Sequence, residues 1–179
     1  MKIDHKKGFI ILGCLLILGM LIALFLVYEH FSDVASKWCT FGDSFNCGIV
    51  NKSPYSNLDG ISYLMTMDLK LPVPYFYTVS KPFLLDLLTS NGFLGFLTLL
   101  LLFSMLIAWR RKSDFLFIKH GSIKRWIIGI LGFGIVYGGY LFLIQHFILK
   151  TYCLFCLMLD LTMILSMATI LLLENEVTK

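Results

Sequence analysis

The sequence predicts an all-α integral membrane protein, a bundle of four transmembrane helices with an extracytoplasmic cap between the first and second helices. Of its 179 residues, 58% are hydrophobic and only 15% are charged. The mean hydropathy of +0.84 is far from that of a soluble domain. Since a spanning helix needs about 20 apolar residues, the chain has room for about four of them and one sizeable connection. We therefore expect a single membrane domain over residues 1–179, with no nucleic-acid partner.

Long apolar segments with polar or basic ends define the expected helices. Their ranges are about 8–28, 88–109, 126–147 and 153–173, and the cap covers about 29–81. In the third segment, Gly134 and Gly138 have the small-xxx-small spacing that lets two helix backbones approach closely. Cys14, inside the first segment, is expected to be a buried packing residue because free cysteine behaves as a small hydrophobe.

Basic residues indicate how the chain is oriented in the membrane. The first seven residues contain three lysines, and the loop between Trp109 and Trp126 contains six basic residues. By the positive-inside rule, both segments lie in the cytoplasm. The cap and the link between the third and fourth helices then lie outside it. We expect a multi-pass protein of the plasma or inner membrane with both termini in the cytoplasm.

Two cysteine pairs are expected on the outer side, Cys39 and Cys47 in the cap and Cys153 and Cys156 at the start of the fourth helix. A Cys-x-x-Cys motif puts two thiols on one face of a helical turn, where the helix N-terminus favours the thiolate of the outer one. Four cysteines allow three pairings, and the sequence does not choose among them. A disulfide within either pair would close only a short loop and would therefore contribute little to stability. Both pairs are better suited to thiol–disulfide exchange than to a structural role.

An alternative from another functional class is a non-catalytic membrane protein whose four cysteines are structural or bind zinc. Four thiolates are a common zinc ligand set, but bound zinc would make the cysteines unreactive in redox chemistry. We favour redox chemistry and expect no metal.

Asp160 lies inside the last apolar segment, where an ionisable residue is costly. Together with Cys153 and Cys156 it follows i, i+3, i+7 spacing and shares one helix face with them. Two interpretations remain open. Asp160 either transfers a proton during the redox reaction near the cysteines or forms a hydrogen bond to a neighbouring helix.

The joint spacing of several motifs is more specific than any Cys-x-x-Cys alone. The motifs are Cys39-x7-Cys47, Ser53 six residues after Cys47, the segment Ser53-Pro54-Tyr55-Ser56 followed by Gly60, and Tyr152-Cys153-x-x-Cys156. Over nearly the whole chain this layout resembles the vitamin K epoxide reductase family. That family couples thiol oxidation to quinone reduction, so the resemblance implies a disulfide-forming, quinone-dependent oxidoreductase.

The resemblance also implies a route for electrons. It makes Cys39 and Cys47 the pair that meets a redox partner, and Cys153 and Cys156 the pair that meets a quinone such as ubiquinone or menaquinone. Many microbial members carry a fused thioredoxin-like domain, which is absent here, so a separate thioredoxin-fold thiol oxidase on the outer side is implied. The net product is disulfides for exported proteins. The alternative within the family is that reduction of a quinone or quinone epoxide is the main physiological role.

Three further residues are implied near the quinone. The resemblance makes Ser53 a polar residue under the cap and Asn91 the candidate for a hydrogen bond to the quinone from the second helix. In vertebrate members a tyrosine stands four residues after the last cysteine, and here that position holds Asp160. The shape and polarity of the quinone pocket are therefore expected to differ.

Overall fold

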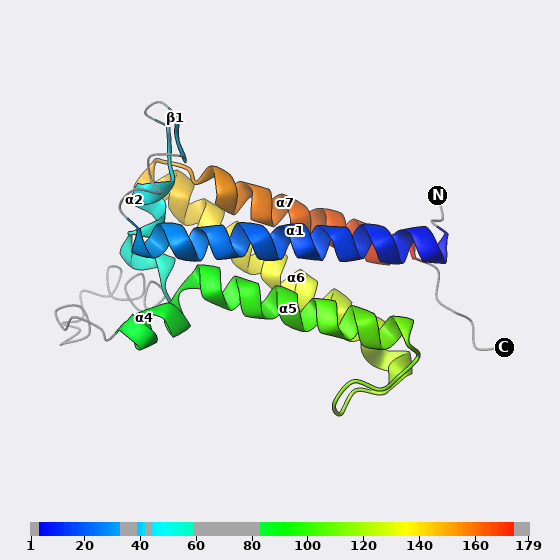
Figure 1. Ribbon diagram of the computed structural model, residues 1–179. Helices are drawn as coiled ribbons and strands as arrows, with labels where there is room; N and C mark the ends of the chain where they lie inside the picture. Colours follow the sequence, from blue (N-terminus) through cyan, green and yellow to red (C-terminus); the bar gives the residue numbers. More distant parts are fainter. Residues whose placement is uncertain (1–3, 33–38, 42–43, 59–82, 174–179) are drawn as a thin grey trace, which may run out of the picture.

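Four long helices dominate the computed structural model, which describes residues 4–32, 39–41, 44–58 and 83–173 (Figure 1). They are α1 (His5–Phe31), α5 (Asn91–Arg110), α6 (His120–Ile144) and α7 (Leu154–Leu172). Each is long and apolar enough to cross a membrane, α6 together with the π-helical turn η3 (Gln145–Leu149) that continues it. The predicted all-α membrane bundle is confirmed.

The helices pack as a closed bundle in which α1 and α6 each contact both α5 and α7. Apolar side chains fill the centre, among them Leu12, Leu16, Leu102, Met105, Ile127 and Leu131. The outward faces are apolar too, with Leu21, Val136 and Leu161 more than half exposed. A helix that is apolar on every side needs an apolar surrounding for its outer face. A bilayer supplies that surrounding.

The described part of the cap, together with α4 after it, forms short elements at one end of the bundle (Figure 1). They are β1 (Thr40–Phe41), β2 (Phe45–Asn46), α2 (Cys47–Asn51), the 3₁₀ helix η2 (Pro54–Ser56) and α4 (Phe83–Thr89). The two strands pair antiparallel. The Asn46 side chain accepts a hydrogen bond from the Ile49 N–H (3.1 Å) and so caps α2. Gly60, one residue of the family resemblance, lies outside the described residues.

The opposite end of the bundle carries most of the described basic residues. There the start of α1, the link from α5 to α6 and the end of α7 lie together, away from the cap (Figure 1). Both described cysteine pairs are at the cap end, one beside β1 and α2 and the other at the start of α7. The two pairs therefore lie at the same end of the bundle.

Two helix boundaries differ from the prediction for local reasons. α6 begins at His120 rather than near 126, because the fully buried Ile123 extends the packed face while basic side chains can reach the polar interface. The second predicted helix, 88–109, is divided at Ser90. The Ser90 hydroxyl accepts a hydrogen bond from the Phe93 N–H (3.4 Å), so it ends the preceding turn and caps α5.

The prediction for Cys14 was wrong, because this residue is exposed on the outer face of α1. Leu12 and Leu16 take the inward positions on either side of it. A small, weakly polar thiol can face lipid as readily as a protein core. Composition alone does not distinguish the two apolar surroundings.

The close approach predicted from Gly134 and Gly138 is observed between α6 and α7. A Cβ atom on Gly138 would overlap the Asp160 carboxylate, and one on Gly134 would overlap the Met163 side chain. By contrast, a Cβ atom on Gly139 would meet no described atom within 4 Å. Of these three glycines, only Gly134 and Gly138 face α7 at this close contact.

We predict that Gly138→Ala destabilises the bundle while Gly139→Ala does not. Overpacking costs about 1–3 kcal/mol, whereas alanine at an open helical position is favoured over glycine by up to about 1 kcal/mol. Thermal unfolding of the two variants in the same detergent measures the difference. Equal midpoints would show that Asp160 moves aside without cost and that the glycine is not needed for packing.

Candidate functional site

The first cysteine pair of the site is oxidised. Cys39 and Cys47 form a disulfide with their Cα atoms 5.5 Å apart. Cys39 directly precedes β1, and Cys47 begins α2 directly after β2, so the hairpin between them brings the two residues together. Both are 0% exposed. Among the three pairings that the sequence allowed, the structure has this one.

The second pair lies at the start of α7. Cys153 is the N-cap residue rather than the first helical residue, and its sulfur accepts a hydrogen bond from the Cys156 N–H (3.2 Å). The two sulfurs are 2.6 Å apart, and Cys153 is buried while Cys156 is half-buried. This places the two thiols together on one turn, close enough for a disulfide to form between them.

A short stretch of backbone pairing holds the cap against the second pair. The Asn46 N–H donates to the Tyr152 carbonyl (3.1 Å), and the Tyr152 N–H donates to the Ser44 carbonyl (2.9 Å). Cys47 directly follows Asn46, and Cys153 directly follows Tyr152. Both cysteines belong to one apolar cluster of buried residues. The two redox pairs are therefore neighbours in space although more than a hundred residues separate them in the chain.

Gln145 fixes the backbone of Cys153. Its buried side-chain carbonyl accepts a hydrogen bond from the Cys153 N–H (2.8 Å). The chain between them turns at Lys150, which has a left-handed φ of 53°. Such a conformation is uncommon for a residue other than glycine and ends the π-helical turn. The third helix expected from the sequence, about 126–147, contains Gln145 without a role for its side chain, so this contact was missed.

A cavity of about 550 Å³ opens beside Cys156. Its lining includes the three residues that the resemblance placed near a quinone, Ser53, Asn91 and Asp160. The other lining residues are mainly apolar side chains of α1, α5, α6 and α7. Its volume and mostly apolar wall are typical of a site for a small organic molecule. Of the four cysteines in the two pairs, Cys156 is the one that lines it.

Asn91 is held in place at the cavity by two contacts. Its amide nitrogen donates to the Tyr55 carbonyl (2.9 Å), and its amide oxygen accepts from the Tyr137 hydroxyl (2.8 Å). An amide nitrogen has two hydrogens to donate, so Asn91 keeps one for a carbonyl group in the cavity. Tyr137 was not singled out by sequence reasoning, because a tyrosine within an apolar helix has no distinctive spacing.

Ser53 and Asp160 contribute polar atoms at different places in the wall. The Ser53 hydroxyl donates to the Val50 carbonyl (2.7 Å), which stabilises the turn that follows α2. Asp160 lies against Gly138 of α6 and on the same helix as Cys156, one turn further from the cap. The wall therefore has an acid within the membrane span, close to the half-buried thiol.

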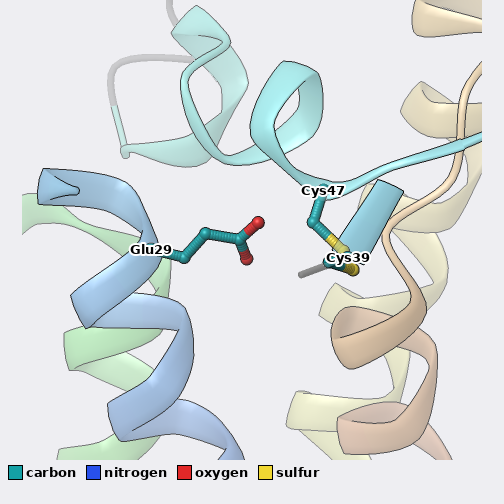
Figure 2. A group of neighbouring side chains, drawn as sticks. All are labelled: Glu29, Cys39 and Cys47. Carbon is teal, nitrogen blue, oxygen red and sulfur yellow. A yellow bond between two sulfur atoms is a disulfide. The ribbon is translucent and has the colours of Figure 1, made fainter. Parts of the chain in front are cut away.

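Glu29 is a candidate site residue that sequence reasoning missed. Its side chain is 0% exposed, and one carboxylate oxygen, Oε2, accepts a hydrogen bond from the Asn51 amide (2.7 Å). Figure 2 shows the carboxylate pointing from α1 toward the disulfide, and a carboxylate oxygen and the two sulfurs lie within 4.8 Å of one another. Glu29 has little sequence signal, because an acid directly after an apolar segment is typical of a solvated helix end.

These three side chains form a possible ligand set for a metal only in the reduced state. Zinc binds cysteine as the thiolate, and the disulfide removes both thiolates of Cys39 and Cys47. The arrangement is instead suited to thiol–disulfide exchange. The oxidised pair Cys39–Cys47, the outer pair, lies next to Cys153 and Cys156, the inner pair. The inner pair borders a cavity for a small molecule.

The sequence model of the vitamin K epoxide reductase family matches residues 10–171 of this chain. No curated protein and no solved structure matches the chain.

Proposed function

This chain belongs to the vitamin K epoxide reductase family, and we propose that it is a thiol:quinone oxidoreductase that makes disulfides for exported proteins. The family implies quinone-linked redox chemistry in a membrane. The observation that supports the proposal most is the sequence of neighbouring groups: the Cys39–Cys47 disulfide, then Cys153 and Cys156, then the cavity that Cys156 lines.

Both cap cysteines are 0% exposed, so in the first step we propose, a reduced thioredoxin-fold partner docks outside the cytoplasm, displaces part of the cap and attacks the Cys39–Cys47 disulfide. The attack forms a mixed disulfide, and the second thiol of the partner resolves it. The partner leaves oxidised, and both cap cysteines become thiols. Reoxidation of this pair by a Cys153–Cys156 disulfide then carries two electrons inward. The backbone pairing of Asn46 with Tyr152 supports Cys47 and Cys153 as the residues that meet.

In the second step, the Cys153/Cys156 dithiol is reoxidised at the cavity. A quinone bound there would supply an acceptor for two electrons and two protons. The cavity residues fit such a molecule, because the wall is mainly apolar and Asn91 has an amide hydrogen for a carbonyl oxygen. Cys156 borders the cavity, so its sulfur is the group that faces the acceptor. We assign Asp160 the task of holding a proton for this step.

The proposed orientation puts the cap outside the cytoplasm and the link between α5 and α6 inside. Its support is the basic composition of the link and of the first seven residues of the sequence. The link and the start of α1 lie at the end of the bundle away from the cap (Figure 1). In this orientation the cap disulfide faces the compartment in which protein disulfides persist.

Purified protein should oxidise a small dithiol with stoichiometric loss of quinone absorbance. Cys153→Ser and Cys156→Ser should each lower this rate by at least about 100-fold, because the reacting nucleophile is gone. Cys14→Ala is the matched control, since its side chain faces away from the site, and it should keep the full rate. Tightly bound zinc with unreactive thiols, or quinone reduction that survives in Cys153→Ser, would contradict the proposal.

Asp160→Asn should slow quinone reduction at least about 10-fold while leaving exchange with a dithiol unchanged, because proton transfer by a positioned side chain contributes about 10²–10⁴-fold. The substitution keeps the size of the side chain against Gly138 but removes its ability to take up and release a proton. Stopped-flow measurement of each half-reaction separates the effects. Equal slowing of both, or of neither, would reduce Asp160 to a packing residue.

A further inference from the structure

Glu29 is a buried ionisable group to which the proposed electron route assigns no role. Its Oε1 atom is fully buried and has no hydrogen-bond partner among the described residues. An acceptor in that situation is costly, because it has lost water without gaining a donor. The other oxygen is held by Asn51, so the unpartnered oxygen has a fixed position. The Glu29 carboxylate as a whole lies next to the cap disulfide (Figure 2).

The exchange between the two pairs requires a proton acceptor at this place. A cysteine attacks a disulfide as the thiolate, so each cap thiol must lose its proton first. Cys39 and Cys47 are both 0% exposed, which keeps bulk water from serving as the base. Among the described residues, the Glu29 carboxylate lies within 4.8 Å of both sulfurs and is in a position to accept these protons.

We propose that Glu29, oriented by Asn51, accepts the protons of Cys47 and Cys39 while the cap pair is reoxidised. The proposal rests on the proposed function, since it assumes that the cap dithiol reduces a Cys153–Cys156 disulfide. It adds a carboxylate on α1 to a reaction otherwise carried by cysteines of the cap and α7.

The step can be written so that atoms and electrons balance. The Cys47 proton passes to Glu29, the Cys47 thiolate attacks the Cys153 sulfur, the Cys153–Cys156 bond breaks, and Cys156 leaves as a thiolate. The Cys39 thiolate, formed in the same way, then attacks the Cys47 sulfur, closes the Cys39–Cys47 bond and releases Cys153. Two electrons move to the inner pair. Two protons move with them. Glu29 passes the first proton to the Cys156 thiolate before it accepts the Cys39 proton, which it passes to the Cys153 thiolate, so it ends in its starting state.

Asn51 connects the proposed proton acceptor with the first leaving group. Its amide nitrogen donates to Glu29, and its amide oxygen lies 3.9 Å from the Cys156 sulfur as a hydrogen-bond acceptor. One side chain therefore contacts both the carboxylate that takes the proton and the sulfur that receives one. This contact explains why a polar residue, 8% exposed, lies between the two pairs.

A single-turnover experiment can separate this step from quinone chemistry. Fully reduced protein is mixed with one equivalent of a quinone, quenched with acid at intervals, alkylated and analysed by mass spectrometry. A Cys153–Cys156 disulfide should form first, with loss of the quinone, and a Cys39–Cys47 disulfide should replace it. Glu29→Gln keeps an oxygen for the Asn51 amide but cannot accept a proton. It should leave the first phase within about 2-fold and slow the second by at least about 10-fold.

Three further variants test whether the effect is chemical. Glu29→Asp should recover part of the second rate, because it restores a carboxylate. Asp86→Asn, the matched control, removes a carboxylate at the same end of the bundle that binds His30 and Asn57 instead, and should change neither phase. Should Glu29→Gln fail to fold, Asn51→Ala should still slow the second phase, since the carboxylate loses its orienting contact.

The outcomes distinguish this inference from the function on which it rests. A second phase in Glu29→Gln or Asn51→Ala that is as fast as in the unmodified protein would overturn the inference, and so would equal slowing of both phases in Glu29→Gln. Absence of the first phase in the unmodified protein would instead overturn the proposed function.

Discussion

The backbone pairing between β2 and the residue that precedes Cys153 is the contact on which the site depends. It joins the cap, which is built early in the chain, to the start of the last helix. Each hydrogen bond contributes only about 0.5–1.5 kcal/mol net, so the pairing is stable because of its surroundings. The cap disulfide closes the hairpin, and buried apolar side chains cover both cysteines next to it. Without this contact, the outer pair would have no fixed position relative to the inner one.

The bilayer explains why buried polar groups are concentrated at the cap end of the bundle. Along most of their length, the helices bury and expose apolar side chains, and polar groups there are few. Near the cap, by contrast, Gln145 holds Cys153, Asn51 holds Glu29, and Tyr137 holds Asn91. Buried polar groups must be bonded to be tolerated. At the cap end, Glu29 Oε1 and Asn57 Oδ1 are buried without a hydrogen-bond partner among the described residues. Glu29 and the half-buried Asp160 are the two acids to which we assign proton transfer.

The sequence predicted the parts of the site that have local signals. Apolar length predicted the four spans, basic residues predicted which loops share a side, and cysteine spacing predicted the two pairs. Long-range contacts have no such signal. Glu29 and Cys47 come together only because α1 ends beneath the hairpin, and Cys14 faces outward because of how α1 packs. Cys153 caps α7 rather than starting it because Gln145, eight residues earlier, binds its backbone N–H.

The central claim is that electrons cross between the pairs through Cys47 and Cys153, and a paired trapping experiment tests it most directly. In a Cys14→Ala background, Cys39→Ser with Cys156→Ser leaves only Cys47 and Cys153, whereas Cys47→Ser with Cys156→Ser leaves only Cys39 and Cys153. Mild oxidation followed by mass spectrometry under non-reducing conditions measures disulfide formation in each. Our account predicts rapid formation of Cys47–Cys153 and little or no Cys39–Cys153. The reverse preference, or no disulfide in either protein, would contradict it.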